Sequence, residues 1–198
     1  MNSSTTGPTA IARPAVPGRY PAELERTWIP AGRPPVCIRA LRPTDIELEL
    51  QLVDDLSPET LHLRLQYSAT EVTRRDLERL LDTDYVERLG LGGIVREPSG
   101  ERLVGVSRYA RIEGTTRAEC AIVVADAWQG CGLGTELMRT LALAARERGY
   151  TRLEGETLAE NARLVEWARR FGFDVGTQPH SGGLMRVIID LEHLPDEP

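Results

Sequence analysis

The sequence predicts an α+β fold in which helices flank a mixed, mostly antiparallel β-sheet. Two features of the hydrophobic pattern indicate this class. Apolar residues recur at helical spacing between residues 46 and 81, and from residue 89 onward they form extended runs separated by short turns. In the second half of the chain, helical and strand-like segments alternate, which favours layers of helix packed on a mixed sheet.

Composition limits the classes of protein that fit. A chain of 198 residues is long enough for one domain with a sizeable core. Its net charge of −6 argues against nucleic-acid binding, and no apolar run approaches the roughly 18 residues that span a bilayer. Three cysteines without a C-x-x-C pair predict no disulfide framework and suit a reducing cytoplasm. No metal site is expected, because the three histidines are scattered (His62, His180, His193).

The first residues differ in composition from the rest. Residues 1–19 are rich in Ser, Thr, Pro and Ala and hold little apolar surface, so we expect a flexible tail there. They lack the charged and apolar regions of a secretory signal. The folded domain is expected over residues 20–198.

A short hairpin and three helices are predicted at the start of this domain. Residues 28–29 and 36–41 form the hairpin around a turn rich in Pro and Gly. Thr44 is expected to cap the first helix and Ser57 the second, and the third helix is expected to begin at residues 73–76. The expected apolar faces of the first and third helices are Ile46, Leu50, Val53 and Leu56, and Leu77, Leu80 and Leu81.

Strands and two further helices follow. Residues 89–95 and 103–112 flank a Pro-Ser-Gly turn, and residues 117–124 form the next strand. The segments after it are predicted to be a helix over 135–148 with Gly149 at its C-terminal cap, a strand over 153–158, a helix over 161–171 and strands over 173–177 and 184–191.

The run from Val124 to Gly134 carries the clearest functional signal. A strand leads into a turn with three alternate glycines and then into a helix, and such a helix N-terminus presents backbone N–H groups to an anion. Because Thr135 stands where a third glycine is needed, the dinucleotide-binding fingerprint does not fit, and no Gly-Lys-Ser/Thr completes a P-loop. What fits is Q/R-x-x-G-x-G/A on Gln129, Gly132 and Gly134.

This pattern resembles the acyl-CoA pyrophosphate loop of the GNAT superfamily of N-acetyltransferases. Within that superfamily the chain resembles the Pat-type bacterial protein lysine acetyltransferases. The resemblance spans roughly residues 20–191 and rests on short segments in a shared order, at residues 20–25, 38–43, 56–59, 81–85, 118–124 and 160–173. It implies the predicted fold and acetyl-CoA as the acyl donor, with no metal.

The resemblance also implies which residues hold acetyl-CoA. The backbone of Ile122, Val123 and Val124 would pair with the pantetheine amides as an added strand, and one of its N–H groups could face the thioester oxygen. The pyrophosphate would meet the N–H groups of Gly130, Cys131, Gly132, Leu133, Gly134 and Thr135. Gln129 is expected to order the loop. Asn161 either contacts the cofactor arm or only caps the later helix, and the two roles are compatible.

Glu119 is the candidate catalytic base. A lysine amine must lose its proton before it attacks a thioester, and Glu119 precedes the glycine-rich turn on the same strand. Poor hydration there would make its carboxylate a stronger base. The Pat-type resemblance implies the same role, whereas the alternative is a surface carboxylate without function.

No side chain is assigned as general acid. Many GNAT enzymes place a Tyr seven residues after the Asn, but that position is Ala168 here, beside Trp167. Tyr85 and Tyr109 are possible substitutes, although each could equally be a packed aromatic. The thiolate could leave without an acid, because its pKa in solution is near 8.5.

Three functions are compatible with these patterns. The first is acetylation of a lysine on a protein, with an AMP-forming acyl-CoA synthetase as the expected partner. Acidic residues in the region that resembles the acceptor side could complement a basic patch on it (Asp54, Asp55, Glu59, Glu71). The second is acetylation of a small amine on the same fold, and the third is a non-catalytic acyl-CoA sensor, which would need no carboxylate at Glu119.

Overall fold

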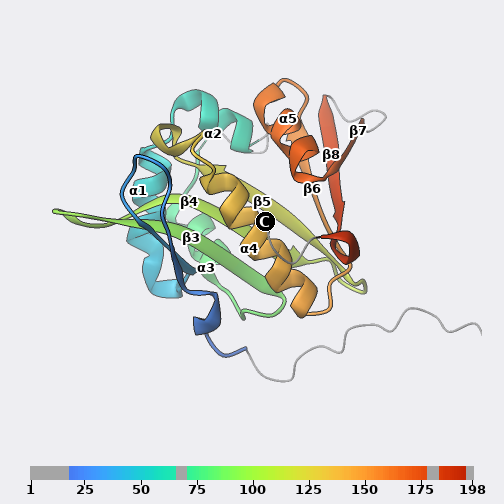
Figure 1. Ribbon diagram of the computed structural model, residues 1–198, viewed down its shortest axis with the longest axis horizontal. Helices are drawn as coiled ribbons and strands as arrows, with labels where there is room; N and C mark the ends of the chain where they lie inside the picture. The colour runs from blue at the N-terminus through green and yellow to red at the C-terminus, as the bar shows by residue number, and fades with distance from the viewer. Residues whose placement is uncertain (1–17, 66–70, 178–182, 195–198) are drawn as a thin grey trace, which may run out of the picture.

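The computed structural model describes residues 18–65, 71–177 and 183–194, and its centre is an eight-stranded sheet in the order β1-β2-β3-β4-β5-β6-β8-β7 (Figure 1). The predicted class is confirmed, since helices flank a sheet in which β5 and β6 are the parallel neighbours and the other pairs are antiparallel. The strands are β1 Arg26–Trp28, β2 Val36–Ala40, β3 Arg88–Glu97, β4 Gly100–Arg111, β5 Arg117–Val124, β6 Arg152–Leu158, β7 Asp174–Thr177 and β8 Leu184–Asp190.

The helices divide between two apolar layers. They are α1 Ile46–Asp54, α2 Pro58–Leu65, α3 Arg74–Leu81, α4 Leu133–Glu147 and α5 Ala162–Phe171. In one layer α4 buries Leu137, Met138 and Leu141 against the sheet. In the other, Leu52 of α1 and Leu81 of α3 pack with Leu103 and neighbouring apolar side chains. The α4 crossover between β5 and β6 is what makes these two strands parallel.

The start of α1 differs from the prediction. Thr44 lies in a short 3-10 helix, Pro43–Asp45, and it is Asp45 that accepts a hydrogen bond from the N–H of Arg42 at 2.8 Å. The Asp45 carboxylate also accepts two hydrogen bonds from Arg39 of β2, at 2.7 and 2.9 Å. The expectation that Thr44 caps this helix is therefore wrong: Asp45 stands at the N-cap position, and its carboxylate bonds Arg39 and the N–H of Arg42 instead of the first turn of α1.

The apolar faces of α1 and α3 are also partly wrong. In α1 the buried residues are Glu49 and Leu52, whereas Leu50 and Val53 of the expected stripe are partly exposed. The helix turns this way because Glu49 forms an ion pair with Arg108 of β4. In α3, Leu77 and Leu81 are buried as expected, but Leu80 is 46% exposed.

Other helix ends follow the sequence. The N–H of Thr60 donates to Ser57 Oγ at 3.2 Å, and Thr73 with Asp76 forms a capping box at α3. Gly149 and Gly172 follow α4 and α5 with φ of 84° and 110°, a left-handed conformation that favours glycine. These confirm the predicted helix ends at residues 57, 73, 149 and 172.

The chain termini are described in part. Of the expected tail, Gly18 and Arg19 belong to the described residues, and the N–H of Gly18 donates to the carbonyl of Asp84 at 2.8 Å. His180 lies outside the described ranges. Within them, no helix combines the length and the apolar character needed to cross a bilayer.

Candidate active site

β5 and β6 separate inside the sheet, and this point is called the fork below. Their parallel pairing runs from Arg117 opposite Arg152 to Glu119 opposite Glu154, and it stops there. β5 continues to Val124, still paired with β4 on its other side. The edge of β5 beyond Glu119 therefore faces the opening of the fork.

The backbone groups along this edge can be assigned from their neighbours. The carbonyl of Cys120 points toward β6, since it lies 2.7 Å from where a Cβ on Gly155 would stand. At the other end, Gln129 Nε2 donates to the carbonyl of Val124 at 3.1 Å. Peptide groups alternate between the two sides of a strand, so the N–H and C=O of Ile122 face the fork, whereas those of Val123 face β4.

The glycine turn, defined as residues 129–132, connects this edge to α4. Gly130 and Gly132 have φ of 77° and 95°, so both need the left-handed conformation that glycine adopts at low cost. A Cβ on Gly134 would meet Ile122 and Val124 only at ordinary contact distances of 3.5 and 3.6 Å. The fold itself thus does not require glycine at 134, and its bare backbone leaves room for a ligand at the start of α4.

Side chains hold the glycine turn in place. Gln129 bridges the strand end and α5, because its Oε1 accepts a hydrogen bond from Arg163 at 2.7 Å while its amide nitrogen bonds Val124. Cys131 contacts the carbonyl of Trp128 through its sulfur at 2.9 Å, and Thr135 accepts a hydrogen bond from the indole of Trp167 at 3.0 Å. Gln129 therefore orders this loop in the way that the sequence predicts.

The remaining predicted residues lie around the same opening. Leu133 is fully buried under the start of α4, so its N–H rather than its side chain is available there. Asn161 caps α5, since its Oδ1 accepts a hydrogen bond from the N–H of Leu164 at 3.1 Å. Of the two roles expected for Asn161, the structure shows the helix cap. The edge of β5 beyond Glu119 and the N–H groups at the start of α4 are the groups that could hold an extended cofactor with an anionic part.

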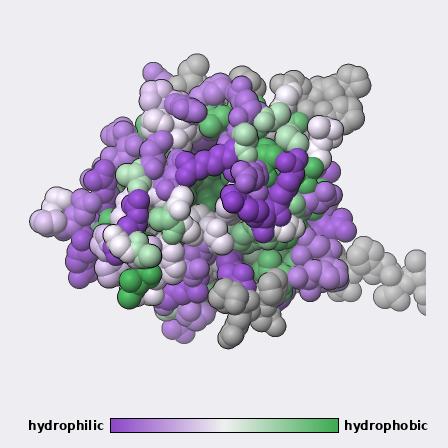
Figure 2. Space-filling view, turned by 45° about the horizontal axis from the view of Figure 1, so that its top comes forward, coloured by the Kyte–Doolittle hydropathy of each residue, from purple (hydrophilic) through white to green (hydrophobic). Residues whose placement is uncertain are grey.

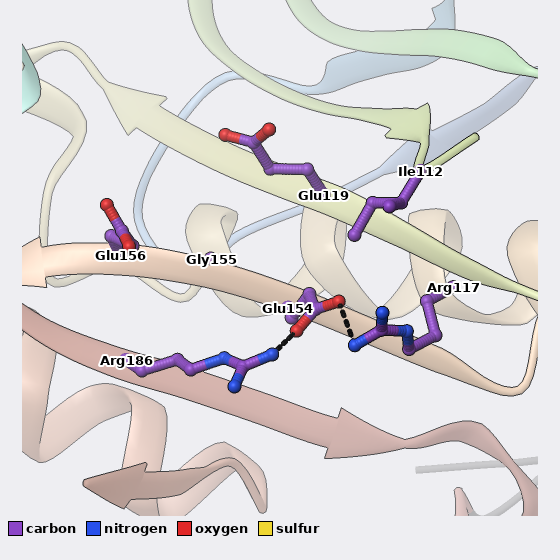
Figure 3. Close-up of a pocket in the computed structure, with 7 residues that line it drawn as sticks. All are labelled: Ile112, Arg117, Glu119, Glu154, Gly155, Glu156 and Arg186. Atoms are coloured by element: carbon purple, nitrogen blue, oxygen red, sulfur yellow. Dashed lines mark hydrogen bonds and ion pairs between the residues drawn. The ribbon is translucent and has the colours of Figure 1, made fainter. Parts of the chain in front are cut away.

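Glu119 stands at the fork beside a cavity of about 390 Å³. Figure 3 shows its carboxylate on β5, with Glu156, Gly155 and Glu154 in order along the neighbouring β6. The other lining residues are Ile112, Arg117, Glu154 and Arg186. Glu119 is exposed, so the poor hydration expected from the sequence is not supplied by the folded chain alone.

Glu154 is the buried carboxylate of the fork. It forms ion pairs with Arg117 of β5, at 3.0 Å, and with Arg186 of β8, as the dashed lines in Figure 3 show. Its side chain is 9% exposed. The two arginines offset the charge of Glu154 and join β5, β6 and β8 at the point where β5 and β6 separate. Glu119, opposite Glu154 on β5, faces solvent.

The buried tyrosine and cysteine beside β5 are unsuited to proton transfer. The Tyr109 hydroxyl donates to the carbonyl of Val86 at 3.0 Å in the α4 layer, and burial raises its pKa. Tyr85 packs edge-on against Tyr20. Burial, followed by the charges of Glu119 and Glu154, raises the pKa of the Cys120 thiol to about 12, so it stays protonated.

Asp126 is a site residue that the sequence analysis missed. Its carboxylate accepts hydrogen bonds from the Ser57 N–H at 2.9 Å, the Ser57 hydroxyl at 2.8 Å and the Thr60 hydroxyl at 2.8 Å. These bonds tie the start of α2 to the segment between β5 and the glycine turn. The sequence signal for it is weak, because Ser57 and Asp126 are 69 residues apart.

A charged cluster of Glu49, Arg64 and Arg108 was also missed. Arg108 of β4 donates to Glu49 of α1 at 2.6 Å, and Arg64 of α2 lies close enough for its charge to act on both and on Glu119. Figure 2 brings forward the end of the molecule that holds α2 and the glycine turn, where hydrophilic residues dominate and hydrophobic ones show between them. Over the described ranges, no group of three or more His, Cys, Asp or Glu is arranged to hold a metal.

Comparison with known proteins gives concordant matches. A family model described as the acetyltransferase (GNAT) family matches residues 52–173, which include the fork and the glycine turn. A Pseudomonas aeruginosa protein named as an acetyltransferase is 36% identical over 138 residues, which are 70% of this chain and 74% of that protein.

Two further matches are to proteins named Pat. Acetyltransferase Pat of Mycolicibacterium smegmatis is 32% identical over 137 residues, which cover 68% of this chain and 40% of that longer protein. The solved GNAT domain of S. lividans PAT has a TM-score of 0.78 at 26% identity, over 87% of this chain and 99% of that one.

Proposed function

Because the chain belongs to the acetyltransferase (GNAT) family, we propose that it transfers an acetyl group from acetyl-CoA directly to a lysine amine on a protein. The observation that carries the proposal is the position of Glu119, at the fork and beside the cavity. A protein that only sensed acyl-CoA would need no carboxylate at this point.

Acetyl-CoA, when bound, supplies a thioester that carries the acetyl group and ends in a thiol leaving group. The N–H groups from Gly130 to Thr135 would bind its pyrophosphate, because a helix N-terminus favours negative charge. The edge of β5 at Ile122 and Val124 would receive its amides as an added strand, and Asn161 would keep the adjacent end of α5 in place.

Glu119 would accept the proton of the incoming ammonium and so generate the neutral amine that attacks. General-base catalysis of this kind contributes about 10²–10⁴ in rate. The N–H of Ile122 faces the fork and would donate to the oxygen on which negative charge develops.

No side-chain acid is part of this mechanism. Ala168 is buried where many family members place a tyrosine, and the hydroxyl of Tyr109 is engaged with Val86. A thiol with a pKa near 8.5 is a good enough leaving group to depart without one.

We propose an AMP-forming acyl-CoA synthetase as the acceptor, in the cytoplasm. Support comes from the Pat-named relatives and from exposed acidic side chains near α1 and α2 (Asp54, Glu59, Glu71). Asp55 does not belong to this set, because Arg102 binds its carboxylate at 2.8 and 3.0 Å. The alternative acceptor is a small amine, which a cavity of about 390 Å³ could also take.

Labelled acetyl-CoA separates these alternatives. The protein is incubated with a purified AMP-forming acyl-CoA synthetase or with spermidine, at low and high salt, and with Glu119→Gln as the inactive control. We expect labelling and inactivation of the synthetase, weakening as salt rises because opposite charges guide the encounter. Efficient acetylation of spermidine with an unlabelled synthetase would establish the small-amine alternative.

A further inference from the structure

Arg108 and Glu119 project from the same face of the sheet. In the antiparallel pair of β4 and β5, Ala110 is opposite Glu119 and Arg108 is opposite Ala121. Residues two apart on a strand share a face, and such diagonal neighbours lie about 7–8 Å apart. Arg108 is therefore one diagonal step from the catalytic carboxylate, on the side that faces α1 and α2.

Arg108 has hydrogen-bonding capacity to spare. Its Nη2 donates to Glu49 at 2.6 Å, and the two side chains are only 13% and 4% exposed. Its Nη1 is buried and has no hydrogen-bond partner within the residues that the structure describes. Since buried donors are almost always paired, this nitrogen marks a place where a ligand oxygen would be stabilised.

Arg64 brings a second positive charge to this side of the fork, because α2 is held there by Thr60, which donates to Asp126 after β5, and by His62, which contacts Glu160 after β6 at 3.1 Å. Arg64 lies in the last turn of α2 and is partly buried. Burial, and then the charge of Arg108, lowers its pKa, while Glu49 and Glu119 act in the opposite direction. Glu49 is ion-paired with Arg108, so the charge of Arg64 adds to a pair that is already neutral.

The cavity on the other side of Glu119 has a different character. Glu119 lines it together with Glu154, which is ion-paired with Arg117 and Arg186. The Glu119 carboxylate would attract an ammonium group on this side, and the two arginines would attract an anion on the side of Arg64 and Arg108. Glu119 therefore stands at the boundary between a region suited to an amine and a region suited to a carboxylate.

We propose that Arg64 and Arg108 form a carboxylate subsite, so that the preferred acceptor carries a carboxylate close to the amine that is acetylated. The fork of a planar guanidinium matches the two oxygens of a carboxylate. This inference rests on the proposed acetyl transfer at Glu119 and names its substrate class. The carboxylate can come from an acidic residue next to a target lysine or from the α-carboxylate of a free amino acid.

Matched acceptors test the inference. One pair is the capped peptide Asp-Lys-Asp and its Asn-Lys-Asn counterpart, and the other is lysine and cadaverine, which lacks the carboxylate. Rates of CoA release at saturating acetyl-CoA give KM for each, and calorimetry in the presence of CoA gives affinities without turnover. In at least one pair, we expect the carboxylate-bearing acceptor to have a KM about tenfold lower and an affinity about tenfold higher than its counterpart. In Arg64→Gln, both ratios should fall toward one.

Two further variants complete the design. Arg64→Lys keeps the charge without the fork and should retain part of the preference. Arg79→Gln removes an exposed arginine of α3 and should retain all of it. Circular dichroism confirms that each variant is folded.

The outcomes separate the two claims. Calorimetric preference without turnover would contradict the proposed function and keep the subsite. Turnover with equal values for both members of each pair, no measurable binding of any acceptor, or a preference unchanged in Arg64→Gln would overturn the subsite. A preference in the peptide pair alone would identify the protein side chain as the source of the carboxylate.

Discussion

Asp45, Glu49 and Glu154 are carboxylates that the fold removes from water, and each contacts arginine. Their partners are Arg39, Arg108, and Arg117 with Arg186. Burying an ion pair gains little net stability, but removing one partner leaves an uncompensated charge. These pairs therefore fix the strands and α1 around the site, and the exposed Glu119 remains available for proton transfer.

Asp45→Asn tests this structural role. It would leave Arg39 buried without its ion pair, and we expect a loss of about 3–5 kcal/mol in the free energy of unfolding, measured with urea. The control is Glu47→Gln, which removes an exposed ion pair with Arg74 and should cost less than about 1 kcal/mol. Equal losses in the two variants would contradict the assignment.

The same pair predicts a pH dependence. Burial raises the pKa of Asp45, but the hydrogen bonds from Arg39 and Arg42 lower it more, so the net shift is downward from 3.8. Because the folded pKa lies below the unfolded one, the stabilisation is present above pH 3.8 and is lost as the pH falls through the folded value. Urea titrations of Asp45→Asn should therefore show a flatter decline on acidification than those of the unmodified protein.

At the scale of elements, the start of α4 and the start of α2 form the two walls of the opening. The glycine turn sets the direction of α4, and Asp126 joins it to α2. Asp126 and the glycine turn both belong to the segment that follows β5. In the proposed mechanism, this one segment would position the sites for acetyl-CoA and for the acceptor amine together.

Gly132→Ala separates backbone strain from ligand binding. A side chain at φ of 95° costs about 1–2 kcal/mol, and Gly114→Ala, at φ of 71° in a distant turn, carries a similar cost. We expect comparable loss of stability in both variants but weaker acetyl-CoA binding only in Gly132→Ala, as measured by calorimetry. Gly134→Val should also weaken binding, since it fills the space that the bare backbone leaves. Unchanged affinity in folded Gly132→Ala and Gly134→Val would refute the role of the turn.

Asp126→Asn tests the tie between α2 and the glycine turn. Burial raises the pKa of Asp126, but its hydrogen bonds with Ser57 and Thr60 lower it more. The Asp126 carboxylate is therefore ionised at neutral pH and accepts these bonds. The variant should speed hydrogen exchange in the first turn of α2 and raise KM for the acceptor more than for acetyl-CoA. Glu59→Gln on the same helix is the control, and a similar response from it would argue against a specific tie.

The sequence predicted those elements whose signals are local. The glycine turn, the cap at Ser57, the helix start at Thr73 and the strand that bears Glu119 depend on neighbouring residues and were found. The apolar face of α1 was misjudged because Glu49 is buried by a partner, Arg108, that lies 59 residues later. Arg64 and Asp126 were missed for the same reason, since only the folded chain brings them to the fork.

At the scale of the whole molecule, the sheet separates two layers of helices, to which the proposed mechanism gives different tasks. Helix α4 covers one layer and presents its N-terminus at the fork, while α1, α2 and α3 lie on the other side of the sheet (Figure 1), where Arg108 contacts α1 through Glu49. Because β5 and β6 separate at the fork, the two sides of the sheet meet there. A donor held from the α4 side and an acceptor held from the α2 side would therefore meet at Glu119.

The role of Glu119 is tested most directly by Glu119→Gln, assayed with acetyl-CoA and a saturating amine from about pH 6 to pH 9. The variant keeps the size and position of the side chain but cannot accept the proton. We predict a fall in kcat of about 10²–10⁴ with unchanged calorimetric affinity for acetyl-CoA, while Glu101→Gln, at an exposed glutamate of β4, stays near the unmodified rate. Turnover of Glu119→Gln within twofold of the unmodified protein across this pH range would contradict its assignment as the base.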